Sequence, residues 1–150
     1  MGSLVQDIRV PIIRGKIPFV YLIYESIKTR CLGRTVYVEM AETLDVLSSE
    51  EVKNLMHFCG EFGLDYGELD VLRDGEDGFL YVLDANNTPT GPCRLLTKKE
   101  RHNALCILSE TFDKVFLSQM HADVRSLLKA SNLLSEASEE LNKALHSQQQ

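Results

Sequence analysis

The amino-acid sequence predicts an α+β fold: a mostly antiparallel sheet with helices packed on one face, followed by a helical tail. Five short segments rich in β-branched and aromatic residues precede residue 98, and turn sequences join several of them directly, which favours hairpins. A helical pattern interrupts these segments once, and helical patterns alone follow residue 98. A length of 150 residues with 44% hydrophobic and 25% charged residues is typical of one globular domain. We expect that domain over residues 1–118 and an amphipathic tail over residues 119–150.

Three strands are predicted in the first part of the chain. The turn sequence Arg14-Gly15-Lys16 indicates a hairpin that pairs residues 8–14 with residues 17–25. Pro11 has no N–H to donate to a sheet, so we expect it at a sheet edge or at a break. The third segment alternates valine and methionine with other side chains, as a strand does. The strand segments are residues 4–8, 17–24 and 34–42.

A capped helix and a second hairpin follow. Ser48 and Glu51 have the spacing of a capping box, in which each side chain satisfies a free backbone N–H of the other residue. Apolar residues then recur every three to four positions, and Gly63 is a natural helix stop because glycine adopts a left-handed backbone without penalty. The strands at 66–73 and 79–84 flank an Asp-Gly-Glu-Asp-Gly turn, whose residues tolerate positive φ.

Two helical segments complete the chain. Residues 98–120 carry an apolar pattern that includes Leu105 and Phe112. In the tail, apolar residues keep a spacing of three and four, so the tail could pack on the domain or pair with a second copy of the chain. Serine at two of these positions argues against a strong coiled coil. The positions are Val124, Leu127, Ser131, Leu134, Ser138, Leu141 and Leu145.

Composition and charge narrow the class of protein. A net charge of −6 argues against nucleic acid as a partner, and no apolar run approaches the roughly 20 residues of a membrane span. The first residues do not resemble a secretory signal, and the four cysteines are widely spaced, as in reduced cytoplasmic proteins. Basic residues gather in residues 1–38 and acidic ones in 39–92. That asymmetry fits either a cleft with anionic substrate on one side and metal on the other, or two ordinary solvated surfaces.

Oxygen-bearing side chains cluster in the second hairpin. Asp70 lies in its first strand, and Asp84 and Asn86 lie at the end of its second, two residues apart and therefore on one face. Two carboxylates and an amide oxygen match what Mg²⁺ takes from a protein when water and phosphate complete its octahedron. The alternative is a solvated turn in which Asp84 caps the next loop.

The whole string from Gly67 to Pro92 resembles the C-terminal subdomain of the ATP-grasp superfamily, and the resemblance covers about residues 4–118. It implies that Asp70, Asp84 and Asn86 hold Mg²⁺ (or Mn²⁺) on the phosphates of ATP. In addition, the segment Ser3-Leu4-Val5-Gln6-Asp7-Ile8 is similar to the hinge strand that cradles adenine, which implies nucleotide contacts from Gln6, Asp7 and Ile8. The chain departs from the family at Asp84, where glutamate is usual.

The same resemblance implies a carboxylate ligase that activates its substrate as an acyl-phosphate for attack by an amine or a thiol. It suggests Arg30 as a catalytic residue, with Lys28 and Arg73 as further phosphate contacts, although Arg73 faces away from Asp70 on a regular strand. The family's preceding lysine-bearing subdomain has no counterpart here, so we expect half of a ligase, whose missing half comes from a partner chain or from an upstream coding region. A homo-oligomer is the other partner that we expect. The alternative is a non-catalytic remnant that associates through its tail. Whether the chain is an enzyme depends on that choice.

Overall fold

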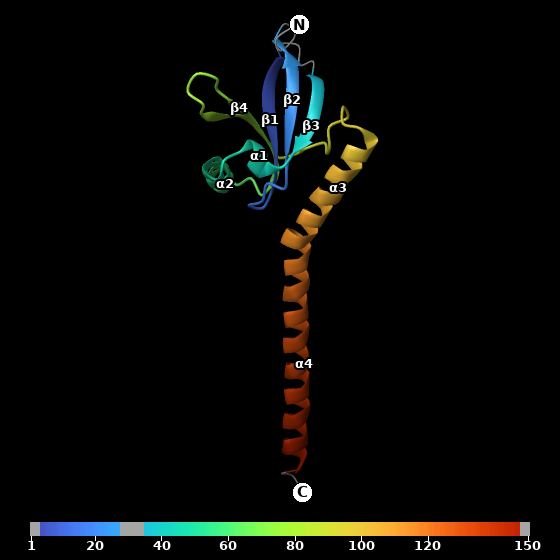
Figure 1. The fold of residues 1–150 in the computed structure, drawn as a ribbon. Coiled ribbons are helices and arrows are strands. Elements are labelled where there is room, and N and C mark those ends of the chain that lie inside the picture. Colours follow the sequence, from blue (N-terminus) through green and yellow to red (C-terminus); the bar gives the residue numbers. More distant parts are fainter. Residues whose placement is uncertain (1–3, 28–34, 148–150) are drawn as a thin grey trace. The chain divides into compact units, whose positions relative to one another are not determined.

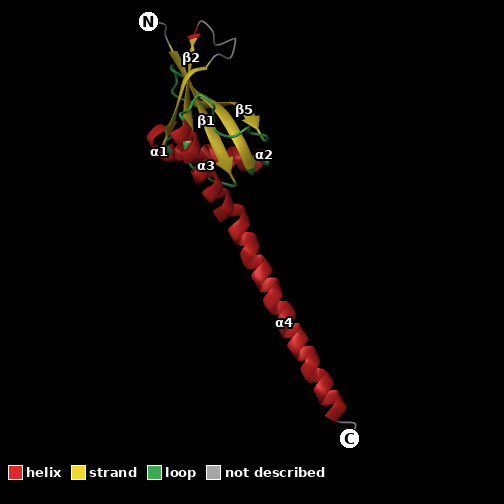
Figure 2. Cartoon of the chain, turned by 90° about the vertical axis from the view of Figure 1, so that its right-hand side faces the viewer, coloured by secondary structure: helices red, strands yellow, loops and turns green. Residues whose placement is uncertain are grey.

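The structure, a computed structural model, describes residues 4–27 and 35–147, apart from some side chains of the last helix (Figure 1). Five strands form one antiparallel sheet in the order β3-β2-β1-β4-β5, which confirms the predicted α+β fold. Figure 2 shows the strands in yellow and the helices in red. The strands are β1 (Leu4–Ile13), β2 (Val20–Ser26), β3 (Thr35–Ala41), β4 (Tyr66–Arg73) and β5 (Leu80–Asn86). The helices are α1 (Thr43–Val46), α2 (Ser49–Phe62), α3 (Lys98–Phe112), the π-helical segment η2 (Asp113–Leu117) and α4 (Ser118–Ser147).

The first hairpin joins β1 and β2 through a tight turn. Arg14 and Gly15 both have positive φ, 38° and 75°, which matches the right-handed twist of the flanking strands. Pro11 lies in β1, the central strand, rather than in an edge strand. However, the β1–β2 ladder ends at the pair of Arg9 and Tyr21, so at Pro11 the central strand pairs only with β4. Pro11 therefore lies at a position of β1 where the side that faces β2 forms no ladder pair, so its missing N–H is tolerated there.

Helix α2 begins and ends as its sequence predicts. The Ser48 N–H donates to Glu51 Oε2 at 2.8 Å, and the Glu51 N–H donates to Ser48 Oγ at 3.3 Å, which completes the capping box. Gly63 ends the helix with a left-handed backbone. The short helix α1 was not predicted, and it leads into Leu47, which is buried.

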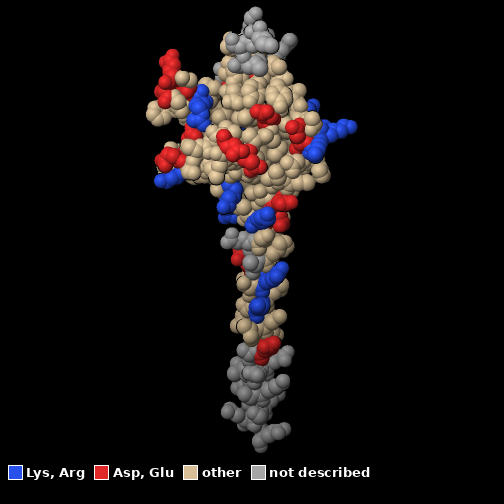
Figure 3. Space-filling model, viewed as in Figure 1, with Lys and Arg blue, Asp and Glu red and all other residues tan. Residues whose placement is uncertain are grey.

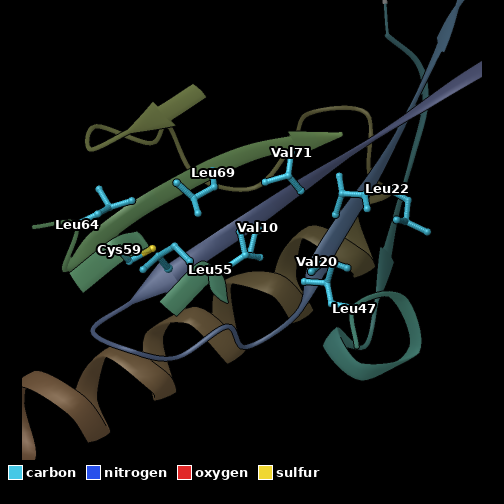
Figure 4. Packing of buried hydrophobic residues seen from close by; sticks show 11 residues of the cluster. Val10, Val20, Leu22, Leu47, Leu55, Cys59, Leu64, Leu69 and Val71 are labelled. Atoms are coloured by element: carbon cyan, nitrogen blue, oxygen red, sulfur yellow. The ribbon is translucent and has the colours of Figure 1, made fainter. Parts of the chain in front are cut away.

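Side chains of the sheet pack into two hydrophobic clusters, one on each face. On the first face, which we call the α2 face, Leu55 and Cys59 of α2 cover strand residues (Figure 4). On the other, the α3 face, Ala104 of α3 joins Phe19 and Tyr21. The α2-face cluster contains Ile8, Val10, Ile12, Val20, Leu22, Leu47, Leu55, Cys59, Leu64, Leu69 and Val71, and the α3-face cluster contains Phe19, Tyr21, Ile23, Val38, Leu96 and Ala104.

Helices therefore cover both faces of the sheet, whereas the sequence predicted helices on one. The unbroken apolar run of residues 17–24 is the signal of this arrangement, because a strand buried on both sides does not alternate. Helix α3 contacts the sheet through the small Ala104, with Ile107 and Leu108 beside it, while Leu105 is exposed. The predicted apolar pattern of this helix therefore matches its packed side only in part, because Leu108 packs on the sheet whereas Leu105 and Phe112 are exposed.

The chain divides into two compact units, residues 1–112 and 113–150. The predicted domain boundary at residues 118 and 119 stays a prediction. Helix α4, in the second unit, is 30 residues long and exposes large apolar side chains. Leu141 and Leu145 of the predicted seam lie outside the described side chains. The exposed set is Met120, Val124, Leu127, Leu128, Leu133 and Leu134.

Charged side chains are spread over the first unit. In the view of Figure 3, acidic side chains gather at the β4–β5 turn, which contains Asp74, Glu76 and Asp77, and elsewhere basic and acidic side chains lie near one another. Across the part of the chain that the structure describes, no helix is long and apolar enough to cross a membrane.

Candidate functional site

The register between β4 and β5 brings the three predicted metal ligands together. Asp70 pairs directly with Asp84, and Glu68 pairs with Asn86. Directly paired residues on neighbouring strands project from the same face of a sheet. Asp70, Asp84 and Asn86 therefore lie on the α3 face, with Glu68 as a fourth oxygen-bearing neighbour. A bulge between Asp70 and Val71 shifts the register at this site, and the pairing resumes beyond it with Val71 opposite Val82.

Arg9 of β1 is the residue at this site that the sequence analysis missed. It pairs with Asp70 across β1 and β4, and its guanidinium binds both carboxylate oxygens, Nε to Oδ1 at 2.6 Å and Nη2 to Oδ2 at 3.0 Å. Such two-pronged contacts are the strongest form of the arginine–carboxylate pair. The available signal was a charged residue between the buried Ile8 and Val10, which had to lie on the opposite face of the strand.

Glu68 and Tyr21 add buried polar groups beside this pair. Glu68 is only 9% exposed, and its Oε2 lies 3.9 Å from Arg9 Nε. Burial raises the pKa of Glu68, and the Asp70 charge adds to that, whereas Arg9 opposes it. The Tyr21 hydroxyl is buried without a hydrogen-bond partner among the described residues, and burial raises its pKa above the ordinary tyrosine range. The ion pair of Arg9 and Asp70 therefore lies beside two polar side chains that have little access to water.

A pocket of about 230 Å³ opens over the site. Among the described residues, its polar lining is mainly acidic, and Arg9 is the one basic residue in it. Of the three predicted hinge residues, Asp7 lines this pocket. The lining residues are Asp7, Arg9, Ile23, Glu25, Thr35, Val38, Asp70, Leu83, Asp84 and Cys93.

The other two predicted hinge residues lie on the α2 face instead. Ile8 belongs to the buried core beneath α2. The Gln6 amide donates to the Tyr24 hydroxyl at 2.8 Å, and that hydroxyl donates to Glu39. Because side chains alternate along a strand, Gln6, Asp7 and Ile8 cannot all face one ligand. The structure therefore does not bring Gln6 and Ile8 to the pocket.

Arg73 also lies away from the pocket. Its guanidinium forms an ion pair with Glu51, and Nη2 donates to the Val46 carbonyl oxygen at 3.0 Å. This contact, with help from Ser48, lowers the pKa of Glu51 to about 2. Arg73 thus ties β4 to the start of α2, and the structure does not support it as a phosphate contact. Lys28 and Arg30 lie outside the described residues.

The donor set can be tested against Mg²⁺ ligation. Asp84 is exposed, while the Asn86 Oδ1 accepts the Thr88 N–H at 2.9 Å and the Thr88 hydroxyl at 3.1 Å. Across the described ranges, no group of three or more His, Cys, Asp or Glu side chains is placed to hold a metal ion. Two carboxylates and an amide nevertheless fit a Mg²⁺ ion that is mostly coordinated by phosphate and water. The guanidinium of Arg9 is the group that such an ion would meet at Asp70.

Comparison with known proteins found no matching family model and no matching curated protein. Among solved structures, the chain is similar to the ATP-grasp ligase PsnB in complex with a phosphomimetic variant of its minimal precursor, Mg and ADP. That match has 20% identity and a TM-score of 0.44, and it covers 67% of this chain and 28% of that one. PsnB with its minimal precursor gives 19% identity and a TM-score of 0.45, over 74% of this chain and 36% of that one. The chain spans about a third of the length of these ligases.

Proposed function

We propose that this domain is an ATP-grasp C-terminal subdomain that binds the phosphates of ATP together with Mg²⁺ or Mn²⁺. The observation that carries the proposal is the register of β4 and β5, which sets Asp70 opposite Asp84 and Asn86 opposite Glu68. Hard oxygen donors on one face, beside a pocket that Arg9 lines, suit a metal–phosphate unit. Asp70, Asp84 and Asn86 would hold the ion, which would offset charge on the phosphates.

Turnover would need more than these residues. In the proposed reaction a carboxylate substrate becomes an acyl-phosphate, and lysines that hold the nucleotide would come from a further subdomain, either of a partner chain or of a longer protein. Arg30 would be the catalytic arginine and Lys28 a phosphate contact, while Asp7 would lie beside the nucleotide. A cytoplasmic location is proposed with it, since Cys59, Cys93 and Cys106 are free thiols.

Removing two of the three ligands should weaken nucleotide binding. We expect the double variant Asp84→Ala, Asn86→Ala to lose about 10- to 100-fold in affinity for Mg·ATP, because each group contributes a charge-assisted or polar contact. Isothermal titration calorimetry measures this affinity. Glu76→Ala, in the β4–β5 turn, removes one negative charge like the double variant and should bind as the wild type does. Wild-type protein that produces no heat with Mg·ATP would refute the proposed site.

A second function, self-association through α4, is favoured by the apolar side chains that this helix exposes. A helix with an apolar stripe usually buries it against a partner. We expect the full chain to form dimers in sedimentation experiments, and Leu127→Glu with Leu134→Glu to make it monomeric at the same concentration. Lys129→Glu changes the charge by the same amount on a different side of the helix, and it should leave the dimer intact. A wild-type chain that stays monomeric at high concentration would exclude this function.

A further inference from the structure

The pair of Arg9 and Asp70 occupies the place that a metal ion would need. The Arg9 guanidinium donates hydrogen bonds to both carboxylate oxygens of Asp70. The proposed metal ion would need the same carboxylate as a ligand. The hydrogen bonds that Arg9 donates to Asp70 raise the pKa of Arg9 above its ordinary value, so the guanidinium remains charged at any physiological pH. A guanidinium and a divalent cation repel each other and cannot share one carboxylate closely. Pairing of Arg9 with Asp70 and ligation of a metal by Asp70 therefore compete.

The charges around the pocket show why a counter-ion is present. In the part of the chain that the structure describes, four acidic residues line the pocket, and Arg9 is the one basic residue among them. Glu68, largely buried, adds a fifth carboxylate within reach of Arg9. Carboxylates that line one pocket repel one another, and a positive charge among them offsets this repulsion. Arg9 supplies that charge in the metal-free protein. The lining acids are Asp7, Glu25, Asp70 and Asp84.

The ion pair between Arg9 and Asp70 is also accessible enough to separate. Its side chain is 36% exposed, and that of Asp70 is 34% exposed, so the pair is not locked into the core. A guanidinium binds phosphate as readily as carboxylate, with the same two-pronged geometry. A nucleotide that brings its phosphates into the pocket would offer Arg9 a new partner and release Asp70 for the ion.

We infer that Arg9 is a built-in counter-ion of Asp70 that keeps free divalent cations out of this site and admits a metal only together with a phosphate-bearing ligand. The inference rests on the proposed function and deepens it. It makes Arg9 a positioning residue that couples two ligands. By thermodynamic reciprocity, the metal and the nucleotide then strengthen each other's binding by the same factor.

The test is a titration of the 150-residue chain with Mn²⁺ alone, monitored by electron paramagnetic resonance. Wild-type protein should bind Mn²⁺ weakly, and Arg9→Gln should bind it at least about tenfold more tightly, since a unit positive charge next to the ion is gone. Arg9→Lys keeps the charge and loses the two-pronged contact, so its affinity should lie between the two. Lys53→Gln, an equal change of charge on an exposed residue of α2, should match the wild type. Thermal melts of each variant verify that it is folded.

A second titration separates the failure of this inference from that of the proposed function. Binding of a fluorescent ATP analogue is measured with Mg²⁺ and with EDTA, and we expect Mg²⁺ to improve the affinity more for the wild type than for Arg9→Gln. If wild-type protein and folded Arg9→Gln bind Mn²⁺ equally well, Arg9 does not compete and the inference is wrong, while the metal site stands. If neither the wild type nor Arg9→Gln binds Mn²⁺ or the nucleotide analogue, the proposed function is wrong, and the inference about Arg9 is wrong as well.

Discussion

The substitution Gly67→Ala is expected to destabilise the domain by about 3 kcal/mol, because overpacking of this severity forces the backbone to move. A Cβ at Gly67 would lie 2.4 Å from the Asn86 carbonyl oxygen and 2.8 Å from Leu64 Cδ1. The carbonyl belongs to β5 and cannot rotate aside as a side chain can. Relief therefore requires β4 and β5 to separate beside the proposed ligand Asn86. Urea denaturation followed by circular dichroism measures the loss of stability, and calorimetry with Mg·ATP should show weaker binding too.

The matched control is Gly75→Ala in the β4–β5 turn. No atom lies within 4 Å of a Cβ built there, so its free energy of unfolding should change by less than about 0.5 kcal/mol. If Gly67→Ala proves as stable as Gly75→Ala, then β4 and β5 are not packed as the structure has them at the site.

Phe19→Ala should destabilise the domain by about 3–5 kcal/mol, the usual cost of removing a buried phenylalanine. Phe19 is 1% exposed on the α3 face, and its ring meets that of Tyr21 edge-on with centroids 5.0 Å apart. The substitution removes this contact and leaves a cavity beneath α3. Chemical denaturation measures the change, and hydrogen exchange should show faster exchange in α3 than in α2.

Phe79→Ala is the control of the same chemistry. Phe79 lies in the β4–β5 turn and is 67% exposed, so its loss should cost less than about 0.5 kcal/mol. Equal destabilisation by the two substitutions would mean that α3 does not cover the second face of the sheet, and the two-sided core would have to be abandoned.

Features that depend on neighbours in the sequence were predictable. The capping box of Ser48 and Glu51 and the left-handed stop at Gly63 are built from residues a few positions apart, and the structure has both. The turn at Arg14 and Gly15 is equally local. Such motifs need no tertiary contact to be recognised, because the backbone groups that they satisfy belong to the same segment.

Features that depend on contacts between distant strands were not predictable from the sequence. Arg9 and Asp70 are 61 residues apart, and their contact exists because β1 and β4 are neighbours in the sheet. The resemblance to the ATP-grasp hinge implied that Gln6, Asp7 and Ile8 contact one ligand, yet the alternation of side chains along β1 places Asp7 on the opposite face from Gln6 and Ile8. Arg73 was correctly expected to face away from Asp70, but its partner Glu51 depended on where α2 packs.

The sequence by itself determined the approximate places of the strands, the capped helix and the hairpin that carries Asp70, Asp84 and Asn86, because short-range periodicity and turn chemistry specify them. Tertiary structure alone decided that helices cover both faces and that Arg9 binds the carboxylate of Asp70. The physical reason is that strand order and helix docking arise from the burial of apolar surface between segments far apart in the chain, which no local pattern records.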